Sequence, residues 1–246
     1  MDRLLYVSMT GANRVMEAQA RNAQNLANVG TTAFKATMDS AVSRKIDGPG
    51  LPSRFNVQTR DTTTDLSSGA LVATGRSLDV ALQGDGWMVV QDAEGAQALT
   101  RRGDLQVDAN GLLRTGAGNL VQGEGGPIAI PPYAQLTLGG DGTVSIVPLG
   151  QGPEAQAVLD RVLLVRPDAE TLERGSDGLF RVRGGELPPA DAEVRMLSGH
   201  LEASNVNMAQ AMVEMIELAR QFELQVRMMR MAGDNADTAA QLMRMG

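Results

Sequence analysis

The chain of 246 residues contains no cysteine, one histidine, and only 3% aromatic residues. The absence of cysteine excludes disulfides, thiolate metal sites and cysteine nucleophiles. With so few aromatic side chains, any core has to be aliphatic and of modest size. The longest apolar runs are too short to span a membrane, and no N-terminal stretch combines a basic lead, an apolar segment and a small-residue cleavage site. We therefore expect a soluble protein without a visible secretory signal.

The charge of the chain excludes one class of partner. The 22 basic and 29 acidic residues give a formal net charge of −7, whereas a broad phosphate-binding surface needs clustered Lys and Arg. We therefore expect no nucleic-acid partner. Because no apolar run reaches the length of a membrane span, we also expect no direct membrane insertion.

Catalytic motifs are scarce. His200 is the single histidine, so any Ser-His-Asp site would have to be built around it. It lies where a predicted strand gives way to a predicted helix, which favours an ordinary boundary residue. A hydrolase centred on His200 is kept as an alternative. The carboxylates are scattered without an obvious acid/base pair, and we expect the chain not to be an enzyme.

Metal and cofactor motifs are equally weak. Asp104, Asp108 and Gly111 are spaced like part of a calcium loop. However, Gln106 and Ala109 stand where a ligand and the required glycine would be. The glycine clusters lack the third glycine of a dinucleotide loop and the Gly-Lys-Ser/Thr of a phosphate-binding loop. We expect no metal and no cofactor.

Both ends of the chain carry residues at helical spacing, and most of these residues are apolar. In the C-terminal part the spacing alternates between four and three residues, at Met208, Met212, Met215, Ala219, Phe222, Val226, Met229, Gly233, Ala236, Ala240 and Met243. A shorter N-terminal series has the same period, at Leu5, Met9, Ala12, Met16, Gln19, Ala23 and Leu26. A mean spacing of 3.5 residues places such side chains in one stripe, which is typical of a helix that packs against another helix.

Methionine is concentrated in the same C-terminal region, where eight of the 14 lie between Met208 and Met245. A methionine-rich recognition surface or a soft-metal site is one interpretation. Five of the eight fall on the stripe, however, and helix packing explains them. Met228, Met231 and Met245 fall beside it, and a wider stripe indicates more than one neighbouring helix. We therefore expect assembly with other subunits rather than a simple intramolecular helical hairpin.

The middle of the chain has the pattern of an antiparallel β domain. Short alternating segments such as Leu78 to Leu82 and Trp87 to Val90 are separated by glycine turns, among them Asn110-Gly111 and Asp177-Gly178. No βαβ pattern is visible. Ahead of this region, Gly48-Pro49-Gly50-Leu51-Pro52 and a Thr-rich stretch favour an extended connector.

The sequence thus predicts an α+β fold, in which N- and C-terminal helices form a coiled-coil layer and an extended connector leads to a central antiparallel all-β domain. The predicted parts are an N-terminal helix within residues 1–36, the connector at 37–75, the β domain at 76–198, and a C-terminal helix within 199–246. The first helix is expected to run from about Arg3 to about Asn28, with Gly30 as a positive-φ cap. The second is expected to begin near His200, with Ser204 or Asn205 as its cap.

Four ordered stretches resemble one family. Asn25-Leu26-Ala27-Asn28-Val29, followed by Thr31-Thr32-Ala33-Phe34-Lys35, resembles the N-terminal motif of flagellar rod and hook proteins. Leu201-Glu202-Ala203-Ser204-Asn205-Val206-Asn207 resembles the motif that opens their C-terminal helix. The stretches from Gly75 to Trp87 and from Arg102 to Leu113 resemble the entry into the family's β region and the hairpin after it. Departures from the family pattern are Leu99 and Leu105, where an aromatic residue is frequent, and Ala33, where Pro or Gly is frequent.

The resemblance implies a structural, non-enzymatic subunit of the bacterial flagellar basal body. Such subunits are exported unfolded through the flagellar type III apparatus without a cleavable signal peptide, and they polymerise with other rod subunits into the periplasmic rod that transmits torque from the membrane ring to the hook. The short chain, the Met-Asp start and the brief connector after Phe34 favour a subunit of the proximal rod. A distal rod or hook subunit of the same family stays open as an alternative.

The residues expected to carry assembly are the apolar stripe positions and the two terminal motifs. They are Leu5, Met9, Ala12, Met16, Ala23, Leu26, Asn25, Asn28, Phe34, Ser204, Asn205, Asn207, Met208, Met212, Met215, Ala219, Phe222, Val226, Met229, Ala236, Ala240 and Met243. A rival interpretation from a different class is a secreted adhesin or effector, whose β domain binds a ligand while the helices form only an oligomerisation stalk.

Overall fold

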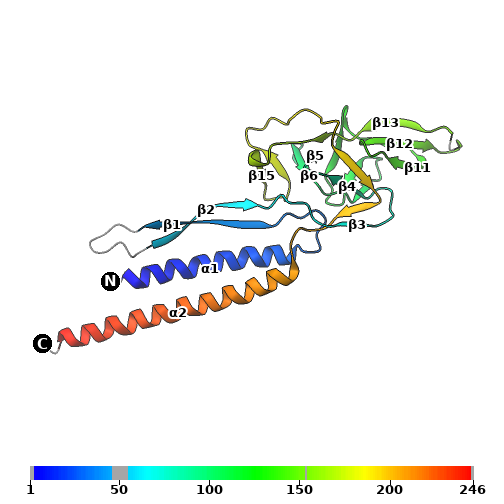
Figure 1. Ribbon diagram of the computed structural model, residues 1–246. Helices are drawn as coiled ribbons and strands as arrows, with labels where there is room; N and C mark the ends of the chain where they lie inside the picture. Colours follow the sequence, from blue (N-terminus) through cyan, green and yellow to red (C-terminus); the bar gives the residue numbers. More distant parts are fainter. Residues whose placement is uncertain (1–2, 46–54, 153, 245–246) are drawn as a thin grey trace. The chain divides into compact units, whose positions relative to one another are not determined.

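The computed structural model describes residues 3–45, 55–152 and 154–244 (Figure 1). Two compact units make up the chain. The helical unit comprises Met1–Val29, Lys35–Asp65 and Val206–Gly246, and the β unit comprises Gly30–Phe34 and Leu66–Asn205. The predicted combination of an N-terminal helix, a C-terminal helix and a large antiparallel β domain is confirmed.

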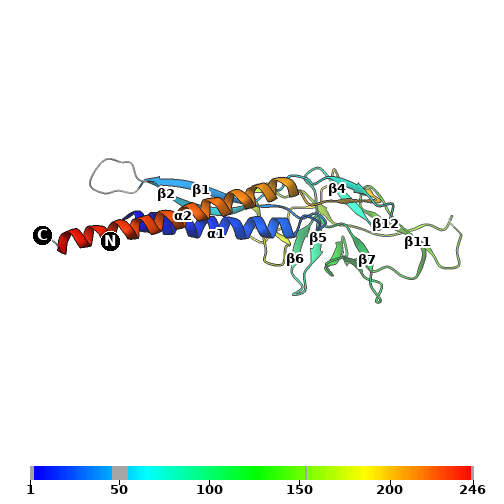
Figure 2. The same ribbon diagram turned by 90° about the horizontal axis from the view of Figure 1, so that it is seen from below.

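Two long helices dominate the helical unit. Helix α1 is Arg3–Ala27 and helix α2 is Met208–Arg244. They lie side by side and run in opposite directions, as both views show (Figures 1 and 2). At the end of α1, the backbone and side-chain amides of Asn28 both donate to the carbonyl of Gln24. These bonds occupy a carbonyl that the last helical turn would otherwise leave without a partner.

Much of the segment predicted as an extended connector forms two paired strands. Strands β1 (Thr37–Lys45) and β2 (Phe55–Thr64) form an antiparallel hairpin in the helical unit, with Thr37 opposite Thr64 and Lys45 opposite Phe55. The β-branched threonines near the end of β2 favour a strand, and the glycines and prolines that suggested a connector are confined to residues 46–54. Those residues lie outside the described part of the chain.

The second helix begins later than the sequence predicted. His200–Glu202 forms strand β18, which pairs with β3 (Leu71–Ala73). Helix α2 starts at Met208, and the side-chain oxygen of Asn207 accepts a hydrogen bond from the backbone N–H of Gln210 at 3.2 Å. Asn207 is therefore the N-cap, and the prediction of Ser204 or Asn205 for this role was wrong.

The described residues of the β unit contain the remaining strands and one 3₁₀ turn, η1 (Ala169–Thr171). Its strands, besides β3 and β18, are β4 (Val80–Gln83), β5 (Trp87–Gln91), β6 (Gln97–Thr100), β7 (Leu105–Val107), β8 (Leu113–Thr115), β9 (Leu120–Gly123), β10 (Gly126–Pro127), β11 (Tyr133–Leu138), β12 (Thr143–Pro148), β13 (Ala157–Arg161), β14 (Leu164–Val165), β15 (Leu172–Arg174), β16 (Phe180–Val182) and β17 (Arg195–Ser198).

These strands form one large sheet and three small ones. In the described residues, the large sheet has the order β15-β16-β6-β5-β9-β8-β7, with β10 added to β9 and β14 added to β5. The small sheets are β11-β12-β13, β17-β4 and β18-β3. The pairs of strands that build these sheets are antiparallel. The arrangement matches the predicted absence of βαβ units.

Strand β5 separates two apolar clusters because its side chains alternate in direction. Met88 and Val90 belong to the larger cluster, which is aliphatic as the composition indicated. Trp87 and Val89 belong to a smaller cluster that also contains Phe180, whose ring centroid lies 4.7 Å from that of Trp87. The single tryptophan is therefore a buried core residue.

The left-handed backbone conformation near the end of α1 occurs at Ala33, with φ = 53°. The predicted positive-φ cap at Gly30 is wrong, because the φ of Gly30 lies outside that range. An alanine in the left-handed region is strained by its Cβ atom, whereas glycine is not.

We expect Ala33→Gly to raise the free energy of unfolding by about 0.5–1 kcal/mol, because it relieves this strain at a smaller cost in unfolded-state entropy. Urea denaturation measures the change. Ala36→Gly is the matched control and should lower the free energy of unfolding, since Ala36 has no positive φ to relieve. An equal decrease of the free energy of unfolding in Ala33→Gly and Ala36→Gly would contradict the prediction.

Arg181 links two aspartates in the β unit, at 2.7 Å from Asp92 and 2.7 Å from Asp177. Hydrogen bonds from Arg181 hold the pKa of both carboxyl groups below the ordinary value. The unfolded chain therefore binds protons at a higher pH than the folded chain. The stabilisation from these pairs is complete above the ordinary Asp pKa of about 3.9 and is lost as the pH falls through the lower folded-state values.

We expect the free energy of unfolding to fall as the pH drops below about 4, and Arg181→Met to make this dependence shallower, because it removes the cause of both shifts. Urea denaturation between pH 7 and pH 2.5 measures the two profiles. Profiles of identical steepness for the native chain and the variant would show that the two pairs do not contribute.

Candidate assembly surface

The two helices of the helical unit bury narrow, regularly spaced faces. On α2 the buried or half-buried positions recur every four and three residues, at Ala211, Met215, Leu218, Phe222, Gln225, Met229 and Ala232. On α1 the corresponding face contains Ser8, Ala12, Val15, Gln19, Asn22 and Leu26. We call these positions the inner seam. Its mean spacing of about 3.5 residues is the spacing that the sequence predicted. This spacing keeps one face of each helix directed at the neighbouring helix.

Small and polar residues occupy much of the inner seam. The side-chain amide of Asn22 is buried and donates to the carbonyl of Ala211 at 2.7 Å. Gly11 lies directly against the side chain of Gln225. A Cβ atom added to Gly11 would be only 3.0 Å from that side chain. Small residues allow two helix backbones to approach closely. The pairing of α1 with α2 therefore buries few of the large apolar side chains.

The stripe predicted from sequence overlaps the inner seam only in part. Ala12, Gln19, Leu26, Met215, Phe222 and Met229 belong to both, and Val226 and Gly233 are half-buried beside the seam. The other predicted positions are exposed, namely Leu5, Met9, Met16, Ala23, Met208, Met212, Ala219, Ala236, Ala240 and Met243. The sequence pattern followed apolar residues, whereas polar side chains such as Asn22 and Gln225 also contribute to the contact between α1 and α2.

Further large apolar side chains lie exposed on the same two helices, and of these only Met228 and Met231 were expected from the sequence, as residues that widen the stripe. They are Tyr6, Val7, Val213, Ile216, Leu224, Met228, Met231 and Leu242. We call these residues, together with Leu5, Met9, Met16, Met208, Met212 and Met243, the outer apolar surface. Ile216 is 55% exposed and Met243 is 80% exposed. Many exposed large apolar side chains on two neighbouring helices are typical of an interaction site.

The residues of the N-terminal motif make contacts within the chain. The side chain of Asn25 binds both backbone groups of Thr37, donating to its carbonyl and accepting from its N–H, each at 2.9 Å. Phe34 is buried, and its ring centroid lies 4.5 Å from the guanidinium carbon of Arg174. Burial lowers the pKa of Arg174. These contacts give the motif a structural role inside the subunit.

The residues of the C-terminal motif also have partners within the chain. Asn205 donates its side-chain amide to the carbonyl of Ser67 at 3.2 Å, and Asn207 caps α2. Ser204 is half-buried at the end of the β unit. Contacts of these motif residues with other subunits stay a prediction.

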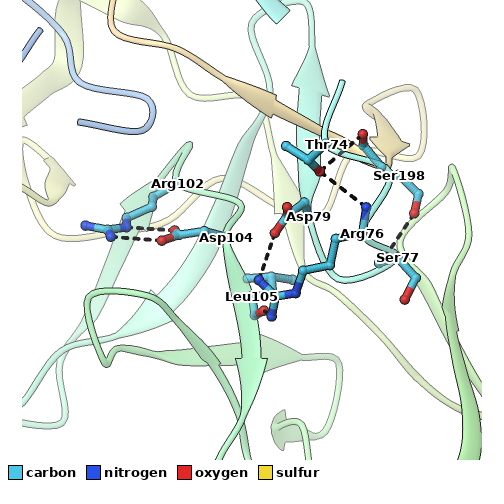
Figure 3. A network of polar contacts seen from close by, with 9 residues as sticks. Thr74, Arg76, Ser77, Asp79, Arg102, Asp104, Leu105 and Ser198 are labelled. Atoms are coloured by element: carbon cyan, nitrogen blue, oxygen red, sulfur yellow. Dashed lines mark hydrogen bonds and ion pairs between the residues drawn. The ribbon is translucent and has the colours of Figure 1, made fainter. Parts of the chain in front are cut away.

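The two internal stretches that resemble the family contain a network of polar contacts (Figure 3). Arg76 donates to the carboxylate of Asp79 at 3.0 Å and to the carbonyl of Leu105 at 2.5 Å. Arg102 forms two parallel bonds with Asp104, at 2.7 and 2.8 Å, and they raise the pKa of Arg102. The network joins the segment before β4 to the start of β7, so these charges have a structural explanation.

The sites considered for chemistry have ordinary surroundings. The Nδ1 atom of His200 lies 3.0 Å from the carbonyl of Ser198, a contact with backbone rather than with a nucleophile or a carboxylate. Within the described ranges, no three His, Cys, Asp or Glu side chains are grouped closely enough to hold a metal ion. Neither of the helices, as far as they are described, combines the length and the apolarity needed to cross a membrane.

Comparison with known proteins identifies the family. Residues 197–242 match the family model described as the flagellar basal body rod FlgEFG protein C-terminal region, and residues 81–146 match that of the flagellar hook protein FlgE/F/G D1 domain. The chain is 40% identical to the flagellar basal-body rod protein FlgF of Escherichia coli K12, and the match covers all of both chains. The chain belongs to the flagellar basal-body rod protein family.

Within this family the chain is FlgF-like. It is 39% identical to FlgF of Salmonella typhimurium over all of both chains. Identity to the flagellar basal-body rod protein FlgG of Buchnera aphidicola from Schizaphis graminum is 32%, over 89% of this chain and 92% of the relative. The family consists of structural proteins of the flagellar basal body, so the expectation that the chain is not an enzyme is confirmed.

Proposed function

We propose that this chain is a subunit of the proximal flagellar rod, that it polymerises through its terminal helices, and that it transmits torque from the membrane ring to the hook. One structural observation supports this proposal above the others. Small and polar residues occupy much of the inner seam between α1 and α2, while many large apolar side chains of these helices are exposed. Fully burying each such side chain yields about 1.5–3 kcal/mol, which favours contacts with neighbouring subunits.

In the rod, α1 and α2 pair as a coiled coil and pack laterally against the helices of other rod subunits, forming an inner layer. The chain divides into four parts, with helices within residues 1–36 and 199–246, a connecting segment at 37–75 and a β domain at 76–198. The helices form the inner layer, and the β domain forms an outer layer. The spacing of the inner seam supports the coiled coil. Axially aligned helices make a stiff tube, because twisting it must disrupt many packing contacts at once.

The partners of the chain are other copies of itself and neighbouring rod proteins. Export occurs through the flagellar type III apparatus, in an unfolded state and without a cleavable signal peptide, and the subunit acts in the periplasmic part of the basal body. Membership of the rod protein family supports these assignments. The rival adhesin or effector function has less support, because its ligand would bind the β unit and the outer apolar surface lies on the helices.

Electron cryomicroscopy of purified basal bodies at side-chain resolution tests the proposal. We expect density for α1 and α2 in the inner layer of the proximal rod, with Ile216 and Met212 in contact with helices of neighbouring subunits. The proposal would be contradicted if the density showed the outer apolar surface facing solvent, or if the rod did not contain this chain. Density in the distal rod or hook would support the alternative subunit type.

A further inference from the structure

The chain passes between the helical unit and the β unit four times, at residues 29–30, 34–35, 65–66 and 205–206. On the β-unit side, hydrogen bonds connect the segments next to these crossings. The backbone N–H of Ala33 donates to the carbonyl of Glu202 at 2.8 Å, and the N–H of Asn205 donates to the carbonyl of Phe34 at 3.2 Å. With the bond from Asn205 to Ser67, these contacts join three segments distant in sequence, which we call the crossing segments: 31–34, 66–70 and 202–205.

The crossing segments 66–70 and 202–205 are packed backbone against backbone. The N–H of Ala203 donates to the carbonyl of Ala70 at 2.8 Å. A Cβ atom added to Gly69 would lie 1.9 Å from the carbonyl oxygen of Ala203, far inside van der Waals contact. Glycine at this position is therefore required by the close approach of the two segments.

The carboxylate of Glu202 lies at the centre of this arrangement and is completely buried. One oxygen accepts from the backbone N–H of Gly69 at 3.0 Å, and the other accepts from the Nε atom of Arg101 at 2.8 Å. The side chain of Arg101 is only 2% exposed. The carboxylate thus contacts a crossing segment on one side and a cation from the sheet region on the other.

Arg101 is in turn fixed by the core of the β unit. Its remaining N–H groups donate to the carbonyls of Leu82, Gly84 and Gly86, at 2.8–3.1 Å. The guanidinium carbon lies 5.8 Å from the centroid of the Trp87 ring. Removing one partner of such a buried pair leaves the other charge without compensation, which is strongly unfavourable. The crossing segments are therefore connected to the core of the β unit through the Arg101–Glu202 ion pair.

We propose that Glu202, held by Arg101, is a positioning residue that makes the three crossing segments open and close as one cooperative unit. Force or motion that passes along the chain between the two units has to pass through these segments. Their coupling keeps the four crossings at fixed spacings within the β unit. The inference concerns the isolated chain and does not depend on the torque role proposed above.

Amide hydrogen exchange on the full-length protein, followed residue by residue by NMR, tests the proposal with Glu202→Gln. The amides of Ala33, Gly69, Ala203 and Asn205 are expected to exchange about ten- to a hundredfold faster, all by a similar factor, because they lose protection in one opening event. The amide of Val89, in the core strand β5, is expected to remain unchanged. Acceleration confined to Gly69 would overturn the proposal, since it would show independent local contacts.

A matched control removes an ion pair next to Arg101 in the sequence. Asp104→Asn removes the negative charge and one of the two oxygens that accept from Arg102 but removes no contact of the crossing segments. We expect the four crossing amides to keep their exchange rates in this variant. Equal acceleration in Asp104→Asn and Glu202→Gln, or acceleration at Val89 equal to that at the crossing amides, would show a general loss of stability and would overturn the proposal.

A second variant keeps the test decisive if Glu202→Gln fails to fold. Asn205→Ala removes the bonds of an exposed side-chain amide to the carbonyl and the hydroxyl of Ser67. Cooperative opening predicts a joint acceleration at Ala33, Gly69 and Ala203, although none of these amides bonds to the Asn205 side chain. Unchanged rates at these three amides would overturn the proposal.

Discussion

A chain that ends at Leu218 is expected to be excluded from the rod and to leave cells non-motile. The truncation starts at Ala219 and removes Phe222, Met229 and Ala232 from the inner seam, together with the exposed apolar side chains beyond them. Without these residues, α1 loses most of its partner helix and neighbouring subunits lose the surface that they would cover. Swimming in soft agar and the composition of purified basal bodies measure the effect.

The same truncation leaves the β unit complete, since this unit ends at Asn205. We expect the truncated protein to keep the thermal unfolding transition of the β unit, with Trp87 fluorescence as its probe. Complementation by the full-length chain is the control for motility. Normal swimming of the truncated strain would contradict the assembly role of α2, and an intact ligand-binding activity would favour the adhesin or effector function.

The variant Ile216→Glu is expected to fold as well as the native chain and still to abolish motility. Ile216 lies on α2 with 55% of its surface exposed, so a charge there is tolerated in the isolated subunit. In the rod, a neighbouring subunit would have to bury an unpaired carboxylate, in addition to losing about 1.5–3 kcal/mol of apolar burial. The loss recurs in every subunit. Circular dichroism measures the fold, and soft-agar swimming measures assembly.

Gln221→Glu is the matched control for this variant. It introduces the same side chain on the same helix, at an exposed position that is already polar. We expect normal folding and motility that is preserved or only slightly reduced. Equal loss of motility in both variants would indicate that charge on α2, rather than the loss of an apolar contact, is responsible. Full motility of Ile216→Glu would show that this part of the outer apolar surface is not covered in the rod.

The sequence predicted the elements that have strong local signals. The first helix was expected from about Arg3 to about Asn28 and is Arg3–Ala27. The antiparallel β domain followed from alternating segments and glycine turns, and positive φ angles at Gly111 and Gly178 agree with two of the predicted turns. Such features depend on neighbouring residues, and a single sequence contains them.

The features that the sequence analysis missed depend on contacts between distant residues. The hairpin of β1 and β2 was hidden by the glycines and prolines between its strands, and β18 was hidden because its partner β3 lies about 130 residues earlier. The inner seam was misplaced for a different reason. Hydrophobic periodicity follows apolar residues, whereas part of the contact between α1 and α2 is made by polar and glycine residues, here Gly11, Asn22 and Gln225.

The accessibility of methionines to mild oxidation, read by mass spectrometry, tests the central claim most directly. Met9, Met16, Met212 and Met243 are exposed in the subunit, and Met88 is buried in the β unit. The account predicts that the four exposed methionines are oxidised rapidly in the isolated protein and protected in purified basal bodies, while Met88 is protected in both. Equal oxidation of the four residues in the isolated protein and in basal bodies would contradict it.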